Sequence, residues 1–225
     1  PLDVHLIATQ VVSRIKNRRP KEWAPRAYKG EVRYHAYPGA VDLSEGNWLA
    51  LATCSYMLND IEEDLRHLGL PYTIYGKTPI KQDLLKAVSA WKRLNHFEQL
   101  NYNDVAAIYA NLKTGFNVKR GYKTLKTLEE GQMYNIESLC MNHGLINAGI
   151  PWDVAFTSLS EKDKSYIMSL EKHGGLGVDP KINLSTIHMA KGGECDNVML
   201  LTDLSRANQD EMEVSPDDTD RVFYV

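Results

Sequence analysis

Residues 181–203 read Lys-Ile-Asn-Leu-Ser-Thr-Ile-His-Met-Ala-Lys-Gly-Gly-Glu-Cys-Asp-Asn-Val-Met-Leu-Leu-Thr-Asp. Two short apolar runs, residues 182–187 and 198–201, flank a polar loop that is dense in ionisable side chains. Runs this short, with β-branched residues at several positions, are typical of buried strands rather than helices. A strand, a Gly-Gly loop and a second strand is an arrangement with which α/β sheets present chemistry at one edge. The same spacing is equally compatible with a simple charged hairpin loop, so the pattern alone leaves both interpretations open.

An earlier part of the chain predicts further strands of the same sheet. Residues 47–53 predict a buried strand, apolar residues at helical spacing up to Leu68 predict a helix, and residues 72–75 predict the next strand. This strand–helix–strand unit is a building block of parallel sheets. The following Gly76-Lys77-Thr78 does not predict a phosphate-binding loop, because Pro71, which has no N–H, stands where such a loop needs a glycine.

Residues 80–173 predict a block of helices between these strand regions. The predicted helices cover residues 80–94, 103–112, 133–145 and 152–170, with a capped start at Ser160. An inserted helical block should form its own small core, around Leu84, Val88, Trp91, Ile108 and Leu139. Within it, Phe116 and Tyr122 are interleaved with cations that predict either a nucleic-acid surface or an ordinary solvated face: Lys113, Lys119, Arg120, Lys123 and Lys126.

The two ends of the chain predict helices as well. Residues 3–19 have the pattern of an amphipathic helix, and residues 203–218 predict an acidic loop. Ser215, Pro216 and Asp218 then predict the start of a last helix. Because both ends begin or stop abruptly within such patterns, we expect the chain to be a piece of a longer protein.

Composition limits the class of function. A net charge of −3 argues against a general coat of positive charge, so any nucleic-acid contact should be local. The three cysteines, at positions 54, 140 and 195, lack the spacing of a zinc site and indicate a reducing compartment. No apolar run approaches 18 residues, so we expect a cytoplasmic protein with no membrane partner. His188, Glu194 and Asp196 form a conceivable metal site, but they lack close His/Cys spacing, so we expect no metal.

Residues 186–194 (Thr-Ile-His-Met-Ala-Lys-Gly-Gly-Glu) resemble the T-[LI]-H-x-x-K-G-x-E signature of superfamily 1 DNA helicases, the UvrD/Rep/PcrA group. Residues 220–225 (Asp-Arg-Val-Phe-Tyr-Val) resemble the start of the next family signature, E-x-x-R-L-x-Y-V-[AG]-x-T-R-A, and residues 4–32 resemble phage-type members. A third stretch, L-Y-R-T-N-x-x-S-x-x-I-E-E-x-L-x-x-x-G-I-P-Y-x-x-Y-G, is matched at Ile61, Glu62, Glu63, Leu65, Gly69, Pro71, Tyr72, Tyr75 and Gly76. The chain departs from the family at Gly193 and Cys195, and at Thr53 and Ser55, where the family has Arg and Asn.

The resemblance implies a RecA-like α/β fold, the second motor domain of a P-loop NTPase-like helicase, with a parallel sheet and helices on both faces. Residues 1–79 and 176–225 would form this C-terminal motor domain, truncated at both ends, and residues 80–175 an inserted helical accessory subdomain. The implied activity is that of an ATP-dependent DNA helicase acting in DNA repair or replication. Such a helicase couples ATP binding and hydrolysis at an interdomain cleft to translocation on single-stranded DNA and unwinding of the duplex. The implied partners are single-stranded DNA, duplex junctions and the N-terminal motor domain of the same protein, which would bind most of the ATP and Mg²⁺.

The resemblance also implies roles for individual residues. Four of them would face DNA: Thr186, His188, Thr53 and Ser55. Four would belong to the ATP side, with Glu194 accepting a hydrogen bond from the ribose: Lys191, Gly192, Glu194 and Arg221. Arg221 and Tyr224 would position the helix that carries an arginine finger, expected after Val225. No catalytic set is complete in these residues, so we expect the fragment alone to hydrolyse no ATP. The departures from the family keep an alternative open, a non-catalytic nucleic-acid or protein-binding module with a helicase-like fold.

Overall fold

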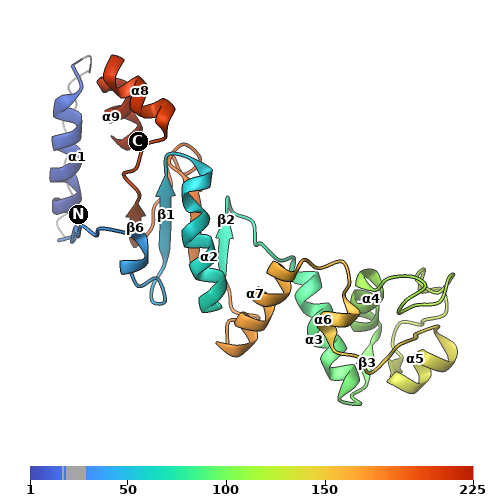
Figure 1. Cartoon of the computed structure of the whole chain (residues 1–225). Helices are drawn as coiled ribbons and strands as arrows, with labels where there is room; N and C mark the ends of the chain where they lie inside the picture. Colours follow the sequence, from blue (N-terminus) through green and yellow to red (C-terminus); the bar gives the residue numbers. More distant parts are fainter. Residues whose placement is uncertain (17, 19–28, 225) are drawn as a thin grey trace. The chain divides into compact units, whose positions relative to one another are not determined.

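The computed structural model describes residues 1–16, 18 and 29–224, and of Tyr224 the backbone only. Part of the segment that resembles phage-type helicases, residues 19–28, therefore lies outside the described residues. The chain divides into two compact units (Figure 1). Unit 1 comprises Pro1–Leu65, Leu70–Lys77 and Asp179–Val225, and unit 2 comprises Arg66–Gly69 and Thr78–Val178.

Unit 1 is built on a four-stranded parallel sheet. Its strands are β1 (Trp48–Ala52), β2 (Tyr72–Ile74), β5 (Ile182–Thr186) and β6 (Asn197–Leu200), in the order β2-β5-β1-β6. The central strand β1 pairs in parallel with both β5 and β6. The strands predicted at residues 47–53, 72–75, 182–187 and 198–201 are thus confirmed. The hairpin interpretation of residues 181–203 is wrong, because β5 and β6 both run parallel to β1 and the chain between them must return along the sheet.

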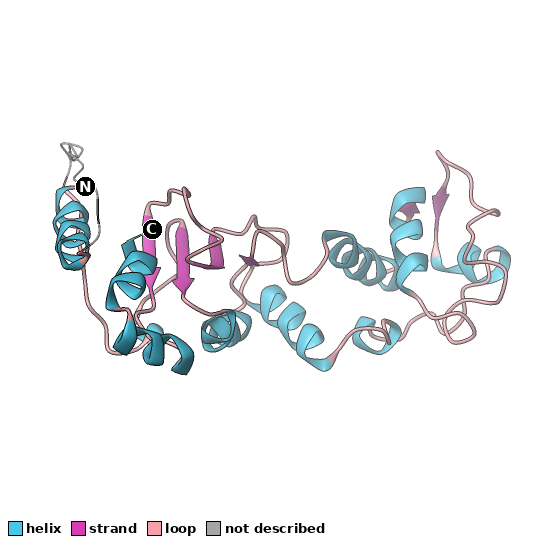
Figure 2. Ribbon diagram, turned by 90° about the horizontal axis from the view of Figure 1, so that it is seen from above, coloured by secondary structure: helices cyan, strands magenta, loops and turns pink. Residues whose placement is uncertain are grey.

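A helix covers one face of this sheet. The short 3-10 turn η2 (Ser55–Leu58) leads into α2 (Asn59–Leu68), which lies against the sheet in both views (Figures 1 and 2). Ile61 and Leu65 of α2 are buried, as are Ala50 of β1 and Leu184 of β5, which stand opposite each other in the parallel pairing. Burial of these apolar side chains is the main stabilising term of such a layered α/β unit.

Three more helices belong to unit 1. They are α1 (Leu2–Arg14), α8 (Arg206–Val214) and α9 (Pro216–Tyr224), and α1 lies beside α9 (Figure 1). Polar contacts stabilise this arrangement: the Arg14 guanidinium of α1 lies 3.7 Å from the Asp220 carboxylate, and the backbone N–H of Lys16, just after α1, donates to Asp217 Oδ2 at 2.9 Å. A further short 3-10 turn, η1, covers Pro38–Ala40.

Two predictions for these terminal helices need correction, and a third is confirmed. The helix predicted over residues 3–19 ends at Arg14, since Ile15 has an extended backbone. The acidic segment predicted as a loop contains α8, whose start is capped by Ser205 accepting from the Asn208 N–H at 3.2 Å. The segment forms a helix despite its low hydrophobicity, because the serine hydroxyl accepts a hydrogen bond from a backbone N–H of the first turn that has no partner within the helix. The helix start predicted at Pro216 is confirmed.

Helices make up only about half of unit 2, so the prediction of an almost continuous helical block is too strong; residues 112–132 in particular form turns and loops. Unit 2 contains α3 (Gln82–Asn95), α4 (Tyr102–Asn111), α5 (Ile136–Asn142), α6 (Trp152–Ala155), α7 (Glu161–Lys172) and two short antiparallel strands, β3 (Leu100–Asn101) and β4 (Met133–Tyr134). Among the described residues, neither short strand pairs with the sheet of unit 1. Four of the predicted core residues are fully buried: Val88, Trp91, Ile108 and Leu139. The fifth, Leu84, is only half-buried.

The bounds of all four predicted helices in unit 2 shift, and for two of them the difference exceeds two residues. The helix predicted from residue 133 begins at Ile136, because residues 133–134 pair in β4 and Asn135 caps the helix by accepting from the Ser138 N–H. The helix predicted over residues 152–170 is two helices, α6 and α7. The capped start at Ser160 is confirmed, with its hydroxyl accepting from the Asp163 N–H at 3.1 Å. No helix in the described part of the chain combines the length and apolar character needed to cross a membrane.

Candidate functional site

The strands of unit 1 bring several polar side chains to one edge of the sheet. Because the four strands are parallel, their carboxyl ends meet at the same edge. Thr53 follows β1, Thr186 ends β5 and Asp203 follows β6. The half-buried Thr53 donates its hydroxyl hydrogen to the carbonyl oxygen of Asp203 at 3.1 Å. Ser55, at the start of η2, is exposed at the same end of β1.

The chain turns tightly after β5. The backbone N–H groups of Met189 and Ala190 both donate to the carbonyl oxygen of Thr186, at 3.1 Å each. A second turn follows, in which the Gly193 N–H donates to the Ala190 carbonyl at 2.8 Å and Gly192 has a φ of +80°. Only glycine adopts that backbone conformation without strain. His188 lies in the first turn with its side chain exposed, and no hydrogen bond to it is found in the described part of the chain.

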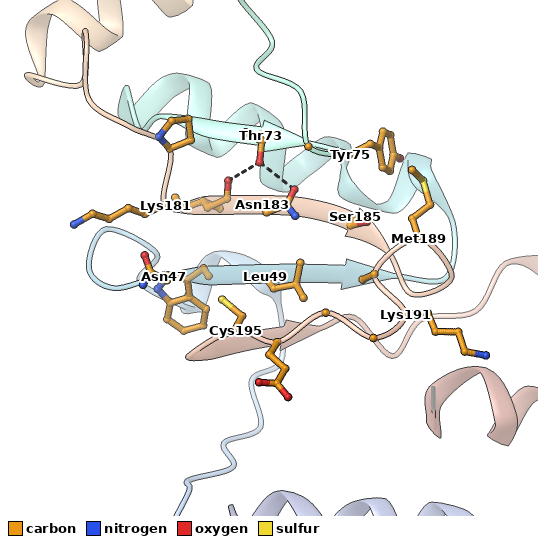
Figure 3. Close-up of a pocket in the computed structure, with 18 residues that line it drawn as sticks. Asn47, Leu49, Thr73, Tyr75, Lys181, Asn183, Ser185, Met189, Lys191 and Cys195 are labelled. Atoms are coloured by element: carbon orange, nitrogen blue, oxygen red, sulfur yellow. Dashed lines mark hydrogen bonds between the residues drawn. The ribbon is translucent and has the colours of Figure 1, made fainter.

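The same loop then encloses a cleft on the sheet (Figure 3). The cleft has a volume of about 590 Å³ and combines strand residues with loop residues. Leu49, Thr73 and Asn183 stand in one row across three strands, since Asn183 is the register partner of both of the others. Residues 189–195 of the loop supply the opposite part of the lining. The cleft exists because the chain between two parallel strands has to run back along the sheet.

Hydrogen bonds fix the polar groups in this cleft. The Thr73 hydroxyl donates to Asn183 Oδ1 at 3.0 Å, and the other dashed line in Figure 3 marks its longer contact of 3.5 Å with the carbonyl oxygen of Ile182. This contact occupies the amide oxygen of Asn183 and leaves its NH₂ group as the donor for another molecule. Ser185, two residues further along β5, also lines the cleft and is 4% exposed. The floor of the cleft is therefore partly polar, with these side chains beside apolar ones such as Leu49.

Tyr75 lines the cleft, and its hydroxyl is buried. Tyr75 and Gly76 have φ values of 52° and 74°, and Ile74 and Lys77 exchange backbone hydrogen bonds of 2.8 and 3.0 Å across them. These features define a two-residue turn in which both central residues have positive φ. Helix α3 begins only at Gln82, which agrees with the rejection of a phosphate loop at this position. Within the described residues, the Tyr75 hydroxyl is buried and has no hydrogen-bond partner.

Charged side chains lie around the rim. Lys181 and Lys191 extend outward at opposite ends of the cleft (Figure 3), and Glu194 is exposed in the loop. Asp196 accepts a hydrogen bond from Asn47 Nδ2 at 3.0 Å, which ties the end of the loop to the start of β1. The described residues contain no group of three His, Cys, Asp or Glu side chains arranged for one metal ion, so His188, Glu194 and Asp196 are not assembled as such a site.

The structure sorts the sequence-predicted site residues into two sets. Lys191, Gly192 and Glu194 line the cleft. The cleft lining does not include the second set, which lies at the carboxyl ends of β1 and β5: Thr53, Ser55, Thr186 and His188. Arg221 joins neither set; it lies on α9, where its guanidinium is 3.3 Å from the Asp218 carboxylate. The side chain of Tyr224 lies outside the described residues.

Sequence reasoning missed the polar floor of the cleft, namely Thr73, Tyr75, Asn183 and Ser185. A signal for part of it was present, because Asn183 and Ser185 are polar residues two positions apart in an otherwise apolar strand. Alternate residues of a strand share a face, so these two predict a polar patch on one side of the sheet.

In comparisons with known proteins, no family model matches the chain, and no curated protein or solved structure matches it.

Proposed function

We propose that unit 1 is a RecA-like C-terminal motor domain of an ATP-dependent DNA helicase of the UvrD-like superfamily 1 group. The observation that supports this proposal most is the course of one loop, which connects two parts of unit 1. Residues 186–194, which resemble the helicase signature, begin at the carboxyl edge of the sheet and end in the lining of the cleft. The proposal assigns one ligand to each of these two places, which the same segment connects.

The cleft is the proposed nucleotide side. Its volume and its partly polar floor suit a ligand with a sugar and polar ring atoms. Glu194 accepts a hydrogen bond from a ribose hydroxyl, and Lys191 adds a cation at the rim. ATP with Mg²⁺ supplies the free energy of phosphoryl transfer when bound. The proposal assigns the Mg²⁺ ligands and the phosphate-binding loop to the N-terminal motor domain of the same protein.

The carboxyl edge is the proposed nucleic-acid side. Thr186, His188 and Ser55 stand at the ends of neighbouring strands, and hydroxyl and imidazole groups bind phosphate oxygens and base edges. Opening and closing of the interdomain cleft with the nucleotide state would move this edge along single-stranded DNA and drive duplex unwinding. Thr53 contributes differently, because its hydroxyl hydrogen is already held by the carbonyl oxygen of Asp203.

Two substitutions separate the two sides in the protein that contains both motor domains. Removing a charged hydrogen-bond acceptor from a sugar hydroxyl typically costs about 1.5–3 kcal/mol, roughly ten- to a hundredfold in affinity. Glu194→Gln should weaken ATP binding at the low end of that range, and Glu45→Gln, an exposed acid outside the cleft lining, is the matched control. His188→Ala should leave ATP affinity without DNA unchanged and weaken the stimulation of ATP hydrolysis by DNA.

The measurements are equilibrium binding of a fluorescent ATP analogue and DNA-stimulated turnover for each variant. Parallel losses in both assays for both variants would refute the division of roles, since they would show that both side chains merely hold the loop in shape.

A second function is favoured by one observation. With its hydroxyl hydrogen engaged by Asp203, Thr53 offers a phosphate neither a charge nor a donor, although the resembling family has arginine there. This contact fits a non-catalytic nucleic-acid or protein-binding module that keeps the fold. Such a module would bind its partner equally well with and without nucleotide, and the intact protein would show no DNA-stimulated ATP hydrolysis.

A further inference from the structure

The loop between β5 and β6 is attached to β1 at both of its ends. At the end near β5, the Ile187 N–H donates to the carbonyl oxygen of Ala52, the last residue of β1, at 3.0 Å. At the other end, the Asn197 N–H donates to the carbonyl oxygen of Asn47, just before β1, at 3.2 Å. Residues 188–196 between these two points form turns and coil rather than a strand. Their position therefore depends on how the two ends are held.

Asn47 makes several contacts at the second attachment point. Its carbonyl oxygen accepts from the Asn197 backbone N–H and also, at 3.1 Å, from the Asn197 side-chain amide. Its own side-chain Nδ2 donates to Asp196 Oδ2 at 3.0 Å. A Cβ on the preceding Gly46 would stand 2.9 Å from Asn197 Nδ2, so the chain before β1 packs closely on these contacts. Asn47 thus holds the end of the loop through both its backbone and its side chain.

The side-chain contact reaches further into the loop than the sheet does. Pairing of β6 with β1 begins at Asn197, and the bond to Asp196 extends the attachment by one residue. Glu194 is two residues away, so its Cα lies within about 7 Å of the Asp196 Cα. The carboxylate makes this hydrogen bond stronger than one between neutral groups, although both side chains are exposed and water competes for it. We therefore expect a modest but local effect on the position of Glu194.

We propose that Asn47 is a positioning residue of the cleft, which fixes the part of the loop that carries Glu194 by holding Asp196 and so sets the affinity for nucleotide. The effect on nucleotide rests on the proposed function. Asn47 also lines the cleft itself (Figure 3), so a direct contact with the ligand is the competing explanation. A direct contact would depend on Asn47 alone, whereas a positioning role depends on Asn47 and Asp196 as a pair.

Exchanging the two side chains separates these explanations in the protein that contains both motor domains. Asn47→Asp brings two carboxylates together and should weaken binding of a fluorescent ATP analogue about three- to tenfold. Adding Asp196→Asn restores one amide and one carboxylate in reversed places, and affinity should return to within about twofold of the wild type. Gln82→Glu makes the same amide-to-carboxylate change at an exposed position of unit 2 and should leave affinity unchanged.

Hydrogen exchange of the 225-residue chain, measured by NMR, reports on the loop without any nucleotide. Asn47→Asp should speed the exchange of the Gly193 and Asn197 amides about threefold or more, and the double variant should exchange like the wild type. The Ala190 amide, which donates to the Thr186 carbonyl at the other end of the loop, should keep its wild-type rate. Denaturant melts should give nearly the same free energy of unfolding for all variants, because the contact is exposed and local.

Three results would overturn the proposal. The first is a loss of affinity that Asp196→Asn does not restore, which would indicate a direct contact between Asn47 and the ligand. The second is wild-type exchange of the loop amides in the Asn47→Asp variant. The third is faster exchange throughout unit 1, which would show a general loss of stability. Failure of the wild-type protein to bind the analogue would instead overturn the proposed function and the effect on nucleotide with it, whereas the exchange rates still decide whether Asn47 holds the loop.

Discussion

A single hydroxyl in unit 2 links its stability to alkaline pH. Tyr109 is 1% exposed, and its hydroxyl donates to the carbonyl oxygen of His143 at 3.0 Å. Burial first, and then the negative charge of the neighbouring Cys140 thiolate, raise the pKa of Tyr109 well above its ordinary value of 10. The charged phenolate is disfavoured in this environment because it would lose its hydration without gaining a cation.

This raised pKa predicts a loss of stability at high pH. Above about pH 10 the unfolded chain releases a proton that folded Tyr109 keeps, so the free energy of unfolding should fall by about 1.4 kcal/mol per pH unit from this group. Tyr109→Phe should remove that slope while costing about 1 kcal/mol at neutral pH for the lost hydrogen bond. Denaturant melts at neutral and alkaline pH measure both effects. Tyr34→Phe, at an 85% exposed residue, is the control and should keep the wild-type slope.

Single residues also mark the limit of what the sequence predicts about the site. The loop from His188 to Glu194 was identified because its glycines and ionisable groups are adjacent in sequence. The contact between Thr73 and Asn183 joins residues 110 positions apart, and it depends on β2 pairing with β5 in one register. The local pattern of each strand indicates which of its faces is buried, but it does not specify that β2 lies beside β5.

At the scale of elements, Gly69 ends α2 in a way that only glycine allows. Its φ is +64°, and the Leu70 N–H donates back to the Leu65 carbonyl at 3.0 Å, which closes the helix end. A Cβ on Gly69 would stand 2.3 Å from the carbonyl oxygen of Ser169, a residue of the same unit. The conformation and the close backbone contact therefore both exclude a side chain.

Gly69→Ala should accordingly lower the free energy of unfolding more than the same substitution at another glycine of positive φ. We expect the conformational penalty of about 1–2 kcal/mol plus the cost of moving a backbone carbonyl, which together exceed about 2 kcal/mol. Gly76→Ala has a similar φ of +74° but open space around the new methyl group, so it should cost the conformational penalty alone. Chemical denaturation measures the free energy of unfolding of both variants. Equal losses would show that the Ser169 carbonyl moves away from the new methyl group at no cost in stability.

Elements differ in how clearly the sequence announces them. The four strands of the sheet and the start of α7 follow from short β-branched runs and a serine cap. Helix α8 escaped prediction because its acidic sequence buries no residue, and the decisive signal was the cap at Ser205. The strand order β2-β5-β1-β6 could not be predicted from local patterns, since it places residues of distant segments side by side.

At the scale of the whole chain, each unit has a core of its own. Ile108 in α4 and Leu184 in β5 are both fully buried, the first in unit 2 and the second in unit 1. The chain passes between the units in short segments, at residues 65–70, 77–78 and 178–179. Few connections and separate cores are the conditions under which parts of a chain unfold as separate cooperative units.

Cavity-forming substitutions should therefore act locally. Ile108→Ala should destabilise unit 2 by about 2–5 kcal/mol, and Leu184→Ala should destabilise unit 1 by a similar amount, because each removes buried methyl groups and leaves a void. Hydrogen exchange followed by mass spectrometry should show faster exchange of protected amides in the substituted unit only. Each variant serves as the control for the other. Faster exchange throughout the chain in both variants would show instead that the two cores unfold as one cooperative unit.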